Sequence, residues 1–199
     1  MAERPRFAVA VLAAGQSRRF APGDKLTAGF LGQQLGELAC HTLAGLDFAP
    51  RWVIAAQADH PCEPSWQADG FTIAVNPQAA AGMGTSVALA ATMALATNAD
   101  GLLIALADMP LVPADHFRAL VTRAVATGPA AIVASAAGSV RSPPAAFGRD
   151  HLAALAAMTG DVGARALLQQ AELVPCAPEL LIDIDTEQAL AQARQACPE

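Results

Sequence analysis

The sequence predicts an α/β protein whose parallel strands end at a ligand-binding edge. Two strongly apolar segments, residues 7–14 and 101–107, are short enough for strands and apolar enough to be buried on both faces. The first leads into a loop with Gly15, two arginines and Lys25, and the second ends at Asp108. Because ligands bind beyond the carboxyl ends of parallel strands, this glycine-bearing basic loop predicts a phosphate site.

Composition narrows the class of protein. The chain has 199 residues, of which 54% are hydrophobic, so one domain over residues 1–199 is expected. A net charge of −6 argues against nucleic acid as a partner, because that affinity comes from neutralising phosphates. The sequence has no apolar run of about 18 residues, so no membrane partner is expected. Four scattered cysteines favour a reduced, cytoplasmic protein over a disulfide framework or a zinc site. The histidines are equally scattered and predict solvated or helix-surface positions: His41, His60, His116 and His151.

The basic loop matches neither of two common phosphate-binding loops. A P-loop needs Gly-Lys-Ser/Thr, whereas here Asp24 separates Gly23 from Lys25 and Leu26 follows. A dinucleotide fingerprint needs three glycines in register, and only Gly15 is present. The alternative for this stretch is an ordinary first strand followed by a basic turn.

The first half of the chain alternates between segments with the apolar pattern of a helix and segments with that of a strand. A helix is expected over residues 35–46, where apolar residues recur at helical spacing, and strands over 52–56 and 71–75. The interval 57–70 leaves room for one helical turn. The glycine-rich residues 81–86 then precede a helix to Ala96, with Thr85 or Ser86 as its expected N-cap. This helix start favours a nucleotide site, because glycines admit close backbone approach and free N–H groups attract anions; the alternative is a simple connection.

Asp108 stands at the exit of the second apolar strand. There a carboxylate could ligate Mg²⁺, which prefers oxygen ligands and substrate phosphates; the alternative is an aspartate that caps the next turn. A helix follows from Pro113 toward Ala126, with Asp115 near its N-terminus.

The last third of the chain contains shorter expected elements. These are a strand over 130–135, a helix over 150–158, a loop over 159–165 opening a helix to 170, an edge strand over 173–175, a strand over 181–186 and a final helix from 187. Alternation in the 181–186 strand puts Asp183 and Asp185 on one face.

Six motifs in order resemble the MobA-like nucleotidyltransferases, and most closely the molybdenum cofactor cytidylyltransferase branch. They occupy residues 12–26, 76–86, 106–110, 141–147, 160–165 and 182–186. The most distinctive are Leu-Ala-Ala-Gly-x-Ser-x-Arg with a spaced Lys-Leu, Leu-Ala-Asp-Met-Pro, and Ile-Asp-Ile-Asp-Thr. Three positions depart from the family pattern: Ala21 and Ser142 where glycine is usual, and Gln34 where proline is usual.

The resemblance implies a Rossmann-like three-layer sandwich with a mostly parallel sheet, the nucleotide-diphospho-sugar transferase fold. It implies transfer of CMP from CTP, or of another NTP's nucleotide, to the terminal phosphate of molybdopterin, with Mg²⁺ as cofactor and pyrophosphate as product. A molybdenum hydroxylase or its chaperone is an implied partner. Two alternatives stay open: transfer to a sugar phosphate or other alcohol phosphate, and a non-catalytic nucleotide- or cofactor-binding partner of a molybdenum hydroxylase.

The motifs also imply roles for particular residues. The implied catalytic residues are Arg19, Lys25 and Asp108; the nucleotide-binding residues are Leu12, Ala13, Ala14, Gly15, Gly82 and Ser86; the metal ligands are Asp108 and Asp185; and the acceptor-binding residues are Asp161 and Arg165. The side chain of Ala14, where guanylyl members tend to have glycine, would narrow the space beside the base and favour a pyrimidine.

Overall fold

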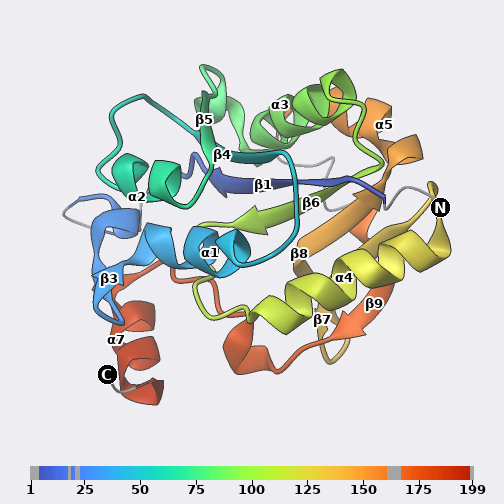
Figure 1. Ribbon diagram of the computed structural model, residues 1–199. Helices are drawn as coiled ribbons and strands as arrows, with labels where there is room; N and C mark the ends of the chain where they lie inside the picture. The colour runs from blue at the N-terminus through green and yellow to red at the C-terminus, as the bar shows by residue number, and fades with distance from the viewer. Residues whose placement is uncertain (1–4, 18, 21–22, 161–166, 198–199) are drawn as a thin grey trace.

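The computed structural model describes residues 5–17, 19–20, 23–160 and 167–197, and its centre is a seven-stranded sheet (Figure 1). The strand order is β5-β4-β1-β6-β8-β7-β9, and only β8 runs antiparallel to its neighbours. The strands are β1 (Phe7–Ala13), β4 (Arg51–Ala55), β5 (Thr72–Val75), β6 (Gly101–Leu106), β7 (Ile132–Ala137), β8 (Val140–Gly148) and β9 (Glu172–Pro175), and a separate hairpin is formed by β2 (Gly29–Phe30) and β3 (Gln33–Gln34).

Helices cover both faces of the sheet, so the predicted three-layer, mostly parallel architecture is confirmed. Helices α1 and α4 contact each other on one face, and α3 and α5 pack together on the other (Figure 1). The described helices are α1 (Leu35–Ala44), α2 (Glu63–Ala68), α3 (Met83–Ala96), α4 (Ala114–Thr127), α5 (Leu152–Ala156) and α7 (Glu187–Ala196), with short 3₁₀ helices η1 (Lys25–Thr27), η2 (Ala79–Ala81), η3 (Arg149–His151) and η4 (Pro178–Leu180). None of these helices is long and apolar enough to cross a membrane.

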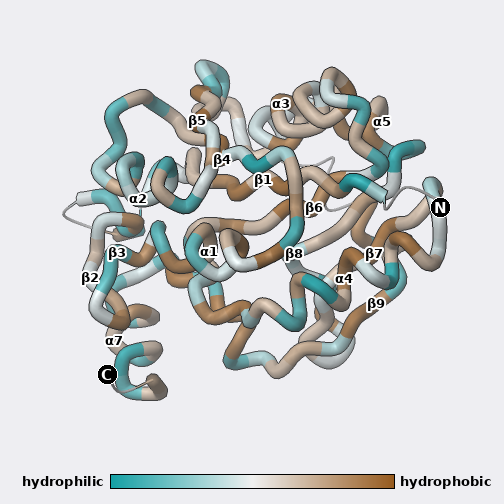
Figure 2. Tube along the Cα trace, in the orientation of Figure 1, coloured by the Kyte–Doolittle hydropathy of each residue, from teal (hydrophilic) through white to brown (hydrophobic). Residues whose placement is uncertain are grey.

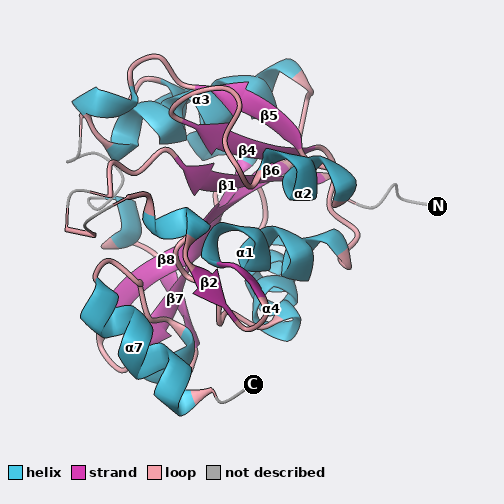
Figure 3. Cartoon of the chain, turned by 90° about the vertical axis from the view of Figure 1, so that its left-hand side faces the viewer, coloured by secondary structure: helices cyan, strands magenta, loops and turns pink. Residues whose placement is uncertain are grey.

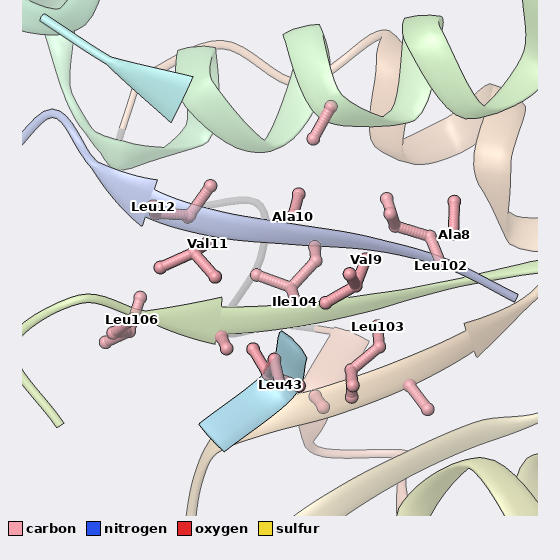
Figure 4. Close-up of a cluster of buried hydrophobic side chains, with 14 of the residues drawn as sticks. Ala8, Val9, Ala10, Val11, Leu12, Leu43, Leu102, Leu103, Ile104 and Leu106 are labelled. Carbon is pink, nitrogen blue, oxygen red and sulfur yellow. The ribbon is translucent and has the colours of Figure 1, made fainter. Parts of the chain in front are cut away.

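The core lies along β1 and β6, where every residue is buried. Their side chains project alternately to the two faces, and Leu43 of α1 meets them on one side (Figure 4). The hydropathy of the chain follows the same layers, with apolar strands inside and polar residues on outer helices and loops (Figure 2). Gly101 permits the close contact at the start of β6, since a Cβ there would lie 2.3 Å from the Phe7 ring.

Strand β1 is the topological switch point of the sheet. It pairs with β4 on one side and β6 on the other, and the chain reaches β4 through α1 but β6 through α3, on opposite faces. Connections that diverge in this way leave a crevice at the carboxyl ends of the two central strands. The predicted phosphate loop after β1 and Asp108 after β6 therefore meet at that crevice.

A second, smaller apolar cluster holds α7 beside the β2–β3 hairpin (Figure 3). Its buried members are Phe20, Phe30, Leu35, Ile184, Leu190 and Ala193. Helix α7 begins where the sequence predicts, because the Thr186 hydroxyl accepts a hydrogen bond from the Ala189 amide as N-cap.

Several local predictions were wrong. No element was predicted over β8, which contains Pro143 and Pro144; its pairing register shifts opposite Ala134 and Ser135, and such an irregularity accommodates prolines. The expected helix over 150–158 is divided between η3 and α5. His60 and His116 are buried rather than solvated, and each ring has a side-chain partner: His60 contacts Asp24, and His116 contacts Ser135.

Candidate active site

A cavity of about 420 Å³ opens at the carboxyl edge of the sheet, beside the ends of β1 and β6. Four segments distant in sequence contribute to it: the end of β1 with its loop, the approach to α3, the end of β6, and the segment before α7. Its lining residues are Leu12, Ala14, Gly15, Gln16, Ser17, Arg19, Lys25, Ala79, Ala80, Gly82, Met83, Ser86, Leu106, Asp108, Asp183 and Asp185.

Most of the predicted site residues lie in this lining. Arg19, Lys25 and Asp108 are all there, and so is Asp185. Of the predicted nucleotide-binding residues, Leu12, Ala14, Gly15, Gly82 and Ser86 line the cavity, whereas Ala13 does not. Successive side chains of a strand point to opposite faces, so Ala13 at the end of β1 turns away. The predicted acceptor residues Asp161 and Arg165 lie outside the described residues.

Lys25, the only lysine in the sequence, is the central cation of the site. Its side chain is 7% exposed, and its ammonium bonds to the carboxylates of Asp108 and Asp185, with Asp183 Oδ1 at 3.8 Å. Burial acts to lower the pKa of Lys25, but the charge and hydrogen bonds of these carboxylates outweigh burial and raise it. Lys25 is therefore a fixed positive charge at neutral pH.

The three carboxylates are in unequal electrostatic positions. Burial and the neighbouring charge of Asp108 raise the pKa of Asp183 to about 7, against the opposing effect of Lys25. Burial also acts to raise the pKa of Asp185, but bonds and charges from Lys25 and Arg19 lower it; Arg19 pairs directly with Asp185. Three carboxylates facing two cations carry one excess negative charge, which either a proton on Asp183 or a bound cation can neutralise.

These carboxylates fit a divalent cation. One oxygen from each of Asp108, Asp183 and Asp185 lies within 4.8 Å of the others. Asp108 Oδ1 is buried and accepts no hydrogen bond from the described residues, which leaves a lone pair for a ligand. An all-oxygen donor set of this kind suits Mg²⁺ or Mn²⁺. The sequence prediction named Asp108 and Asp185 as ligands and omitted Asp183, although it had placed Asp183 on the same face.

The second apolar cluster fixes the two C-terminal aspartates. Ile184 is fully buried in it, so its neighbours Asp183 and Asp185 face the cavity, and the Ile184 amide donates to the Asp108 carbonyl at 2.9 Å. The predicted alternation is therefore present, but the predicted strand over 181–186 is wrong: only this single backbone bond links the segment to the end of β6. Phe20 in the same cluster fixes the chain next to Arg19.

The loop before α3 is a closed polar network. Asn76 is buried and donates from Nδ2 to Thr85 Oγ1 and Ser86 Oγ, each at 2.9 Å. The predicted N-cap was wrong, because α3 already begins at Met83 and its N-cap is Gly82, with a φ of 121°. The Thr85 hydroxyl instead donates within the loop, to the Gly82 carbonyl at 2.8 Å or to the Gln78 carbonyl at 3.0 Å. The network sets the wall of the cavity near Ser86.

Two departures from the family pattern have local roles. The Gln34 amide, which a proline would lack, donates to the Glu37 carboxylate at 3.1 Å and so supports the start of α1. Its side-chain oxygen accepts from Cys62 Sγ at 3.0 Å. Ser142 pairs with Ser135 beside the irregularity in β8. Ala21 lies outside the described residues.

Comparison with known proteins agrees with this geometry. The model of the MobA-like NTP transferase domain matches residues 9–175. The chain belongs to this family. Lys25 and Asp108 lie within the matched residues, and the chain is identified as a nucleotidyltransferase of MobA-like type.

One named protein and several solved structures are similar to this nucleotidyltransferase. The purine catabolism protein PucB of Bacillus subtilis is 30% identical over an alignment 203 positions long, and this alignment covers 93% of this chain and 94% of PucB. A nucleotidyl transferase from Methanothermobacter thermautotroptrophicus, Mth528, superposes with a TM-score of 0.79 at 19% identity, covering 96% of this chain and 97% of that one. Rv0371c from Mycobacterium tuberculosis gives 0.77 at 21% identity, covering 97% and 100%. A second Rv0371c structure, described as a complex with manganese, gives 0.67 at 20% identity, covering 96% and 99%. At these identities the structures establish the shared fold.

Proposed function

We propose that this nucleotidyltransferase is a molybdenum cofactor cytidylyltransferase, which joins CMP from CTP to the terminal phosphate of molybdopterin and releases pyrophosphate. The observation that carries the proposal is the convergence of Arg19, Lys25 and three aspartates on one cavity. That cavity also includes the predicted nucleotide-binding turn at Ala14 and Gly15.

The proposed reaction needs no general base from the protein. A phosphate oxygen of the acceptor attacks the α-phosphorus of CTP, the bond from that phosphorus to the bridging oxygen breaks, and pyrophosphate leaves with the bond electrons. A phosphate monoester has a second pKa of about 6 and is already a dianion near pH 7. Among the described residues that line the cavity, none is a histidine or cysteine, in keeping with a site that acts by positioning and charge.

The chain's own residues would supply charge and orientation. Lys25 and Arg19 would neutralise the triphosphate and the departing pyrophosphate, Lys25 exchanging carboxylate oxygens for phosphate oxygens. Asp108, Asp183 and Asp185 would hold Mg²⁺, which would supply positive charge to stabilise the negative charge of the reacting phosphates. The Mn²⁺ complex described for Rv0371c supports a divalent cation in this fold.

Nucleotide and acceptor would occupy different parts of the site. Leu12 to Gly15, together with Gly82 and Ser86, would bind base and ribose, and the Ala14 methyl group would leave less room for a purine. Asp161 and Arg165 are proposed for the acceptor on the sequence motif, because a guanidinium binds phosphate through two parallel bonds.

The relative PucB suggests the setting of the reaction. Its name assigns that protein to purine catabolism. We propose that the cofactor made here is delivered to a molybdenum hydroxylase, directly or through its chaperone, and that this hydroxylase acts on purines.

One set of incubations tests the proposed function. Purified protein is mixed with Mg²⁺, molybdopterin and each of the four NTPs in turn, and pyrophosphate and the dinucleotide are measured. The proposal expects both products with CTP, each dependent on molybdopterin. Pyrophosphate release only when a sugar phosphate or another alcohol phosphate is supplied would show that molybdopterin is not the acceptor. CTP binding without any pyrophosphate release would indicate a non-catalytic partner.

A further inference from the structure

His60, outside the cavity lining, contacts the loop that carries Lys25. We propose that His60 is a positioning residue that holds Lys25 in place through the carboxylate of Asp24; the inference rests on the proposed role of Lys25 toward the triphosphate. His60 lies between β4 and α2, is 5% exposed, and is separated from Asp24 by 36 positions in sequence.

The direction of the contact follows from the second ring nitrogen. His60 Nε2 lies 2.8 Å from Asp24 Oδ2. The Cys62 amide donates to His60 Nδ1 at 3.1 Å, so Nδ1 must be an acceptor without hydrogen. The hydrogen of the neutral ring is therefore on Nε2, which donates it to the Asp24 carboxylate.

The imidazole is held rigidly on its far side. It stacks on the Trp66 ring of α2, with centroids 4.8 Å apart and planes inclined by 20°. Trp66 is fully buried and donates from Nε1 to the Gly36 carbonyl at 2.8 Å. The Glu63 amide also donates to the His60 carbonyl at 2.8 Å. Helix α2 thus presents His60 as a fixed donor.

The Asp24 carboxylate, fixed by His60, in turn fixes the backbone at Lys25 and at the following residue, Leu26. Its Oδ1 accepts from the Leu26 amide and from Ser17 Oγ, each at 3.0 Å, and Ser17 Oγ accepts from the Lys25 amide at 3.2 Å. Partial burial acts to raise the pKa of Asp24, but bonds from His60, Leu26 and Ser17 outweigh it and lower the pKa. Asp24 therefore remains an acceptor at neutral pH.

Fixing the backbone at Lys25 matters because its side chain is long and flexible. Four methylenes join the ammonium to a backbone whose amide is bonded to Ser17. A displacement of about 1 Å in a reacting group can cost about a hundredfold in rate. Ser17 itself has a left-handed φ of 45°, unfavourable for a residue with a side chain, so the loop needs its side-chain bonds to keep this shape.

Two substitutions separate the contact of His60 with Asp24 from its contact with the Cys62 amide. His60→Gln can place an amide N–H where Nε2 stands, and so keeps a donor to Asp24. His60→Asn can accept from the Cys62 amide but is too short to reach Asp24. We expect His60→Asn to lower kcat by about tenfold or more with little change in acceptor KM, and His60→Gln to keep most of the turnover. His41→Asn, at a histidine 67% exposed, is the matched control and should match the parent.

A double-mutant cycle tests whether His60 acts through Lys25. His60→Asn should weaken CTP binding in the parent and have no further effect in a Lys25→Ala background. Equal turnover for His60→Asn and His60→Gln, or the same loss with and without Lys25, would overturn the proposal. If His60→Asn does not fold, Asp24→Asn takes its place in the cycle. Weaker CTP binding only when Lys25 is present would then support the proposal, and the same loss with and without Lys25 would overturn it.

Hydrogen exchange tests the linkage independently of the reaction. The Lys25 and Leu26 amides should exchange faster in His60→Asn than in His60→Gln, and unchanged rates would refute the linkage even if the parent is active. Absence of pyrophosphate release by the parent with all four NTPs would refute the proposed function and leave this comparison to decide the role of His60.

Discussion

Lys25→Met should destabilise the metal-free protein by about 3 kcal/mol at pH 7.5. Methionine keeps most of the buried volume but removes the charge that faces Asp108, Asp183 and Asp185. Removing one partner of a buried ion pair costs about 3–5 kcal/mol, and the lower end applies because Asp185 is 26% exposed and Asp183 47%. For a chain of this size, that corresponds to a fall in Tm of about 6–12 °C.

The loss should depend on pH with a definite sign. In the parent, Lys25 lowers the pKa of Asp185, so this bond stabilises the fold above the ordinary aspartate pKa of 3.8 and is lost as the pH falls through the lowered value. Without Lys25, burial should raise the pKa values of Asp183 and Asp185 with less opposition, and their negative charge then destabilises the fold as the pH rises. The stability gap between parent and variant should therefore be small near pH 4 and fully open above about pH 7.

Urea unfolding at pH 4.5 and 7.5 in the presence of a chelator measures the gap. Arg118→Met is the matched control, because Arg118 and Asp115 form an exposed pair on α4 whose loss should cost no more than about 1 kcal/mol. Added Mn²⁺ should narrow the gap, since the ion replaces the missing positive charge. A Lys25→Met protein within about 0.5 kcal/mol of the parent at pH 7.5, or an equal loss at both pH values, would refute the charge argument.

Four further predictions concern the metal, the base and the loop after α5. Asp108→Asn should stay folded but lose about a thousandfold in pyrophosphate release; near-normal release would exclude it as a metal ligand. Because the pKa of Asp183 is about 7, Mn²⁺ affinity should rise with pH up to about 7 in calorimetric titrations, and Asp183→Asn should flatten that rise; an unchanged slope would contradict it. CTP should be a better donor than GTP in parallel assays, and a preference for GTP would overturn the branch assignment. Gly84→Ala would bring a Cβ within 2.0 Å of the Gly160 carbonyl, so it should destabilise the fold by about 1–3 kcal/mol and raise the acceptor KM; unchanged urea unfolding would refute this.

The sequence alone determined the frame of this protein. The apolar runs that form β1 and β6 are buried at every residue. Strands buried on both faces are typical of a parallel sheet, in which the loops after the carboxyl ends of the strands lie at the same edge. The basic loop and Asp108 follow those ends directly, so their meeting at one edge could be predicted. The order of the motifs predicted the family and the roles of Arg19, Lys25 and Asp185.

Tertiary structure decided the remaining features through contacts that local pattern does not encode. No strand was predicted around Pro143 and Pro144, yet β8 forms there because β6 and β7 pair with it on both sides. Residues 181–186 alternate like a strand, but the burial of Ile184 against α7 and the hairpin, rather than strand pairing, directs the flanking aspartates into the cavity. His60 looked like a surface residue until packing placed Trp66 beneath it and Asp24 beside it. Such partners are chosen by burial and hydrogen bonding between distant segments, which depend on the folded chain as a whole.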